Sequence, residues 1–117
     1  MARQRRREGG LRVARGEVWL AELDPTVGDE IQKTRPCVVL SPPEMNQQLR
    51  IVIAAPMTTG SRPAPSRIPV YFQERAGFIL LEQIRTLDKR RLIRRLGTVD
   101  QETLGTTPAT LREIFEG

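Results

Sequence analysis

The 117-residue chain contains no histidine and a single cysteine, Cys37. A histidine-based catalytic triad or acid–base pair is therefore excluded. Protein zinc sites draw mainly on cysteine and histidine, so no metal site is expected, and no other cofactor is predicted. Because Cys37 stands inside an apolar run, we expect a buried thiol in a reducing compartment, which favours a cytoplasmic protein.

The chain also lacks any apolar run near 18 residues, so no transmembrane helix is predicted. Residues 1–15 hold six arginines and one acidic residue, Glu8, and so account for the whole net charge of +5. We expect them to form a basic, disordered leader that attracts polyanions, or else a solvated tail or a misassigned start. No apolar stretch follows the arginines, unlike in a secretory signal.

Residues 16–117 balance 13 basic against 13 acidic side chains and are predicted to form a single domain. A nucleic-acid site in this domain must therefore be local. Alternating and β-branched apolar segments between turn residues predict a mainly β fold. Strands are expected at residues 16–23, 36–41, 50–56, 68–72, 78–88 and 93–99. Residues 42–48 and 73–77 are predicted to be turns, and 89–92 a bend or one helical turn.

The C-terminal residues predict an interrupted helix. Asp100 is a suitable N-cap for a first short segment, which Gly105 is expected to end. Thr107 would then cap a second segment that has Pro108 at its first position. Short strands, two long loops and a closing helix together indicate a small, strongly bent antiparallel sheet or partly open barrel.

The two long loops, residues 24–34 and 57–67, adjoin polar residues of chemical interest. Arg35 stands where the first loop enters its strand, and Thr58 and Thr59 stand where the third strand enters the second loop. If these consecutive strands pair, the arginine and the threonines face one another at one rim of the barrel.

Such a rim suits phosphoryl transfer on RNA, where the ribose 2′-OH is already the nucleophile. Arginine offers a planar fork of donors for a charged transition state, and a threonine hydroxyl adds another donor. Arginine is a poor general base, so Glu30 of the first loop is the more suitable proton acceptor. Taken singly, each group also has an ordinary interpretation. Arg35 could be a solvated loop charge, the two threonines could be turn residues, and Glu30 could be a surface carboxylate.

Three blocks of sequence resemble the MazF/PemK family of toxin endoribonucleases. They are "RGEVWLAELDPTVGDEIQKTRPCVVLSP", "AAPMTTG" and "FILLEQIRTLDKRRL", and they cover about residues 15–100 in order. The resemblance implies an SH3-like, partly open barrel of the PemK/CcdB type with a short C-terminal helix, and a homodimer. It also implies a type II toxin that cleaves single-stranded mRNA without a metal, leaving 2′,3′-cyclic phosphate and 5′-OH ends. An acidic, MazE-like antitoxin is the implied partner.

Carried onto this sequence, the family's essential arginine, threonine and loop glutamate fall on Arg35, Thr58 and Glu30. Further RNA-binding residues are expected at Asp29, Lys33, Thr34, Thr59, Arg62, Glu82, Gln83 and Arg85. Because RNA specificity usually rests on unstacked bases, loop residues 26–34 and 57–67 are predicted to set the recognised sequence.

This chain departs from the family at three places. Ile31 and Lys33 replace a glutamine and a glycine that many relatives have, Gly60 follows the threonines where glutamine is common, and the C-terminal helix is interrupted. Two other functions stay open: a CcdB-like protein that poisons DNA gyrase by binding, or an RNA-binding relative without catalysis. The interrupted helix argues against the first.

Overall fold

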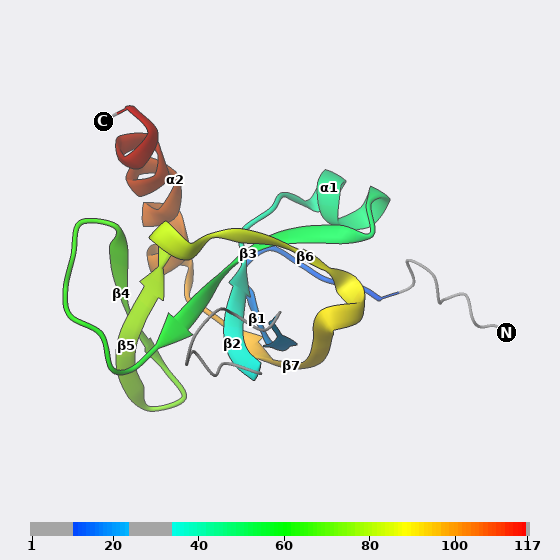
Figure 1. The fold of residues 1–117 in the computed structure, drawn as a ribbon, viewed down its shortest axis with the longest axis horizontal. Helices are drawn as coiled ribbons and strands as arrows, with labels where there is room; N and C mark the ends of the chain where they lie inside the picture. The colour runs from blue at the N-terminus through cyan, green and yellow to red at the C-terminus, as the bar shows by residue number, and fades with distance from the viewer. Residues whose placement is uncertain (1–10, 24–33, 117) are drawn as a thin grey trace, which may run out of the picture.

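The structure is a computed structural model that describes residues 11–23 and 34–116. Its centre is a seven-stranded antiparallel sheet in the order β4-β5-β3-β2-β1-β7, with β6 paired to β3 as well (Figure 1). The strands are β1 (Glu17–Glu22), β2 (Thr34–Val39), β3 (Ile51–Thr58), β4 (Arg67–Phe72), β5 (Arg75–Leu80), β6 (Arg85–Asp88) and β7 (Leu92–Thr98). The helices are α1 (Pro43–Gln48) and α2 (Gln101–Glu116), with short 3₁₀ turns η1 (Leu81–Gln83) and η2 (Lys89–Arg91). The predicted mainly β fold with a C-terminal helix is confirmed.

Strand β3 is the longest strand and pairs with two strands along one edge. β5 lies opposite its end, with Met57 facing Ile79, and β6 lies opposite its start, with Ala54 facing Arg85. From Ala54 to Met57 the chain of β3 covers three residue steps, whereas from Ile79 to Arg85 the opposite chain covers six. The three additional residues form η1. The single strand predicted at 78–88 is therefore wrong: the chain turns sharply at residues 81–83 and resumes pairing.

Two hydrophobic cores lie on the two faces of the sheet, because side chains alternate along each strand. The first core contains Trp19, Cys37 and Val52, among others. The second contains Val18 and Val38, the alternate positions on the same strands. Val13 belongs to the first core, so the chain is already packed before Gly16. Residues 1–10 of the predicted leader lie outside the described residues.

Helix α2 is continuous, which corrects the predicted interruption. The side chain of Asp100 accepts a hydrogen bond from the Thr103 N–H at 2.7 Å, as expected of an N-cap. Thr107, however, is a buried residue inside the helix and not a second cap. Leu104 and Leu111 pack against the second core, and this packing outweighs the backbone hydrogen bond that Pro108 cannot make.

The position of α2 beside the β4–β5 hairpin is visible in Figure 1, and α2 contacts β4. β4 forms one end of the sheet order, a position where the missing N–H of Pro69 is tolerated. Because the helix is continuous, its supposed interruption no longer argues against a CcdB-like binder. Within the described residues, no helix is both long and apolar enough to cross a bilayer.

The predicted turn at residues 42–48 is in fact the short helix α1. Its Asn46 is buried and donates to the Ser41 carbonyl at 2.8 Å, while the Ser41 hydroxyl bonds to the Asn46 side chain. The ammonium of Lys89, in η2, donates to the Asn46 carbonyl. The neighbouring Ser41 and the distant Lys89 therefore hold this helix, which has too few residues to form alone.

Candidate active site

Arg35 in β2 is paired with a residue of β1 on one side, but the pairing of β2 with β3 on the other side does not reach it. It lies opposite Ala21 of β1 and is half-buried. On the other side, the register of β2 with β3 ends where Cys37 faces Pro56. Neither Pro36 nor Pro56 has an N–H to donate, so hydrogen bonding cannot continue the ladder in its usual form. Arg35 thus stands on a fixed strand at the point where β2 and β3 part.

The charge of Arg35 is not neutralised by any described carboxylate. The ion pairs within the described residues involve other arginines: Arg67, Arg90 and Arg95. A half-buried arginine whose guanidinium forms no ion pair within the described residues is well suited to bind an anion such as a phosphate.

Thr58, the last residue of β3, has its hydroxyl oriented by the backbone. The hydroxyl oxygen accepts a hydrogen bond from the Gly60 N–H at 3.2 Å. Since a hydroxyl has one donor and two acceptor positions, its O–H remains available to donate to a ligand.

Gly77 allows β5 to approach Thr58 closely. A Cβ atom at residue 77 would lie 2.2 Å from the Thr58 carbonyl oxygen and 3.2 Å from the Thr59 Cα. Any other residue at position 77 would displace the end of β3. Gly77 therefore helps to place both threonines, a role that the predicted turn at 73–77 did not reveal.

Arg35, Thr58 and Thr59 line one pocket of about 290 Å³. The predicted meeting of the arginine and the threonines at one rim is therefore confirmed in geometry. Other lining residues come from the β4–β5 hairpin, including Gln73 and Arg75. The sequence placed these two only in a turn. Gln73 stands in the tight turn and Arg75 directly follows the turn, a pattern that indicates a hairpin but not the pocket that the hairpin lines.

The Cys37 thiol, two residues from Arg35, is not a candidate nucleophile. Burial raises the pKa of Cys37 to about 11, although the positive charges of Arg85 and Arg35 act in the opposite direction. The thiol is therefore protonated at neutral pH. Its Sγ donates weakly to the Arg35 carbonyl at 3.7 Å, a contact that helps to fix the backbone of the arginine.

The predicted groove residues of the third block lie apart from this pocket lining. Glu82 forms an ion pair with Arg67 at 2.8 Å and accepts a hydrogen bond from the Ser66 hydroxyl at 2.7 Å. Partial burial raises the pKa of Glu82, but the bonds from Arg67 and Ser66 outweigh it and hold the pKa below its ordinary value. Gln83 is exposed in η1. Both residues therefore lie at the bend between β5 and β6.

The remaining predicted site residues are divided between described and undescribed parts of the chain. Thr34 and Arg62 are exposed, and Arg85 is half-buried in β6 opposite Ala54; none of the three is among the pocket-lining residues. Asp29, Glu30 and Lys33 lie outside the described residues, so their predicted roles stay predictions.

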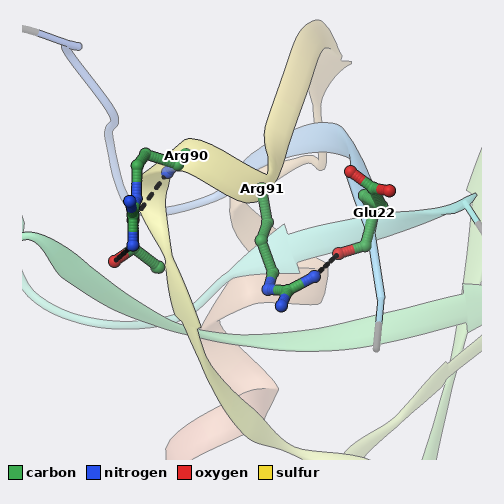
Figure 2. Close-up of polar contacts among 4 residues, drawn as sticks. Glu22, Arg90 and Arg91 are labelled. Carbon is green, nitrogen blue, oxygen red and sulfur yellow. Dashed lines mark hydrogen bonds and ion pairs between the residues drawn. The ribbon is translucent and has the colours of Figure 1, made fainter. Parts of the chain in front are cut away.

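A hydrogen bond fixes the end of β1, just before the first long loop. The guanidinium of Arg91 donates to the carbonyl oxygen of Glu22, the last residue of β1, at 3.4 Å (Figure 2). Next to it, Arg90 is held by the carboxylate of Asp88 at 3.1 Å. The chain just before residues 24–33 is therefore hydrogen-bonded to η2. Arg35 follows the C-terminal end of residues 24–33.

Comparisons with known proteins define the class of protein to which this sheet and pocket belong. A sequence profile described as "PemK-like, MazF-like toxin of type II toxin-antitoxin system" matches residues 14–115. The chain is 39% identical to endoribonuclease MazF of Staphylococcus epidermidis over 90 residues, 72% of this chain and 75% of that protein. It is 35% identical to endoribonuclease EndoA of Bacillus subtilis (strain 168) over 106 residues, 86% of this chain and 91% of that protein.

Solved structures agree with the fold. MazF from Deinococcus radiodurans superimposes with a TM-score of 0.78 at 23% identity, covering 92% of this chain and 99% of that one. A MazE–MazF structure from the same organism gives a TM-score of 0.76 at 23% identity, covering 91% and 97%. The chain belongs to the PemK/MazF family of type II toxin–antitoxin toxins. The predicted family, barrel type and enzyme class, an endoribonuclease, are confirmed.

Proposed function

We propose that the protein cleaves single-stranded mRNA at short sequences, without a metal, by attack of the ribose 2′-OH on the adjacent phosphate. The products are a 2′,3′-cyclic phosphate and a 5′-OH end. The observation that carries the proposal is that Arg35 and Thr58 line one pocket where β2 and β3 part. These two side chains offer a charged fork and a free O–H to one phosphate group.

The roles of the two side chains follow from their donors. As the 2′-oxygen attacks, negative charge increases on the phosphoryl oxygens, and the positively charged, planar guanidinium of Arg35 stabilises it. The Thr58 hydroxyl donates to one of these oxygens while Gly60 fixes its orientation. Glu30 is proposed to accept the 2′-OH proton, directly or through water. The requirement for a 2′-OH makes RNA and not DNA the substrate.

The chain is also proposed to act as a homodimer and to be held inactive by an acidic, MazE-like antitoxin. MazF chains from Deinococcus radiodurans have been crystallised with MazE, which supports the antitoxin proposal. The dimer is supported by exposed apolar side chains on α2 and β4, where Phe115 is 78% exposed and Tyr71 71% exposed. Apolar side chains so exposed are common at interfaces between chains.

Incubation of purified protein with single-stranded RNA in excess EDTA tests the proposal. We expect discrete fragments, cut at a short recurring sequence, at a rate within about twofold of that with added magnesium. Intact RNA in both conditions would favour the non-enzymatic alternatives, and binding to the same oligonucleotides would then separate a silent RNA binder from a gyrase binder. Cleavage that EDTA abolishes would contradict the metal-independent mechanism.

A further inference from the structure

The pocket beside Arg35 has an apolar floor that phosphate chemistry alone does not require. Met57 and Val70 come from the second core, and Phe72 packs against it. Gly97 of β7 lets the sheet approach the Phe72 ring, because a Cβ there would lie 3.2 Å from two ring carbons. At about 290 Å³ the pocket is at the small end of the range for ligand sites, which suits one flat group of moderate size.

The tip of the β4–β5 hairpin, where Gln73 also lines this pocket, has a strained backbone. Gln73 and Glu74 connect the paired residues Phe72 and Arg75, with φ of 53° and 64°. Two-residue turns of this kind prefer Asn-Gly, because side chains other than those of Gly, Asn and Asp are disfavoured at positive φ. The amide of Gln73 donates to the Leu96 carbonyl at 3.3 Å, which fixes the tip against β7. Strain that is retained in this way often accompanies function.

The hairpin tip also brings a second guanidinium to the pocket. Arg75 lines it together with Arg35, and no described carboxylate forms an ion pair with either side chain. Two unneutralised arginines at one small pocket favour a ligand with more than one negative charge. The apolar residues of the same pocket favour a ligand that is also flat and apolar on its faces.

We propose, on the basis of the proposed ribonuclease function, that this pocket binds the nucleobase next to the cleaved phosphate. The base lies on the floor formed by Met57, Val70 and Phe72, as unpaired bases do on apolar and aromatic side chains. Arg75 binds the phosphate that flanks the cleaved one. Gln73, whose amide nitrogen is engaged with Leu96, presents its carbonyl oxygen as an acceptor for an N–H on the base edge. The hairpin tip is thus a specificity element, in addition to the two long loops.

The salt dependence of cleavage tests the role of Arg75. The variant Arg75→Gln is expected to raise KM about tenfold with kcat within about twofold, because the proposed contact holds substrate and not the reacting atoms. Each phosphate contact to a single strand contributes about 0.7 to the slope of log affinity against log salt, so that slope should fall by about 0.7. Arg50→Gln removes an exposed charge between α1 and β3 and serves as the matched control, with KM and slope unchanged.

The cleavage profile on RNA of randomised sequence tests the base pocket itself. Gln73→Ala is expected to reduce the preference at one position beside the cut about tenfold, leaving preferences at other positions unchanged. Melting temperatures of Gln73→Ala and Arg75→Gln within a few degrees of that of the wild type exclude unfolding as the cause of these changes. If the wild type cuts RNA, but Gln73→Ala keeps the same profile and Arg75→Gln behaves as Arg50→Gln does, the pocket proposal is overturned. If the wild type cuts no RNA, the ribonuclease proposal itself fails.

Discussion

Replacement of Arg35 by alanine is expected to lower kcat for RNA cleavage about a thousandfold or more, with the protein still folded. Arginine donors that stabilise charge in a transition state typically contribute factors of about 10³ to 10⁵. Arg35 stands at the end of the β2–β3 pairing and has no ion pair with a described carboxylate. Its loss should therefore change the free energy of unfolding by only about 0.5 kcal/mol or less. Single-turnover cleavage and urea denaturation measure the two quantities.

Two further variants separate the charge of Arg35 from its geometry. Arg35→Lys keeps a positive charge but loses the planar fork, so an intermediate kcat is expected. Arg50→Ala, which removes an exposed arginine between α1 and β3, should cut at the wild-type rate. A folded Arg35→Ala protein that still cleaves at a tenth of the wild-type rate or faster would remove Arg35 from the mechanism.

Replacement of Thr58 by valine is expected to lower kcat about a hundredfold, because it removes the O–H proposed to donate to the phosphoryl oxygen while keeping the shape of the side chain. The same change removes the acceptor for the Gly60 N–H. That bond is exposed, so the free energy of unfolding should fall by no more than about 1 kcal/mol. Single-turnover rates with saturating protein separate this effect on kcat from weaker binding.

Serine at position 58 provides the matched rescue. Thr58→Ser retains both the O–H donor and the acceptor for Gly60, and its kcat should lie within a few-fold of the wild type. If Thr58→Val cuts as fast as Thr58→Ser, the hydroxyl of Thr58 contributes nothing to catalysis. Of the two pocket residues, Arg35 alone would then remain in the proposed mechanism.

The site was predictable where it is formed by strands that are consecutive in sequence. Arg35 precedes one β-branched run and Thr58 ends the next, and neighbouring strands in sequence commonly pair. The observed register of Cys37 with Pro56 brings the two residues toward the same end of the sheet. The alternation of apolar residues and the positions of turn residues were enough to predict that Arg35 and Thr58 lie near each other.

The hairpin contribution was not predictable, because it depends on contacts between residues distant in sequence. Nothing in the sequence indicates that Arg75 reaches a pocket that also contains Arg35, since different strands supply the two residues. The same reason hid Gly77, whose missing Cβ matters only because the Thr58 carbonyl lies against it. A local pattern identifies a turn, but it does not identify what the turn faces.

Two local predictions failed because packing outweighed intrinsic preference. Gly105 and Pro108 predicted a break in the C-terminal helix, yet Leu104 and Leu111 hold α2 against the second core as one helix. The strand predicted at 78–88 includes the polar residues Glu82 and Gln83. They form a 3₁₀ turn in which Arg67 and Ser66 hold Glu82.

The central claim, that the rim of Arg35 and Thr58 promotes attack by the ribose 2′-OH, is tested most directly by removing that one hydroxyl. A short RNA with a single 2′-deoxynucleotide immediately 5′ of the cut phosphate is incubated with the wild-type protein and compared with the all-ribose strand. The account predicts that the deoxy strand binds within a few-fold as tightly but is not cut, while the ribose strand yields 2′,3′-cyclic phosphate and 5′-OH ends. Cleavage of the deoxy strand at the same phosphate would contradict the account, because the nucleophile would then be water or a protein group.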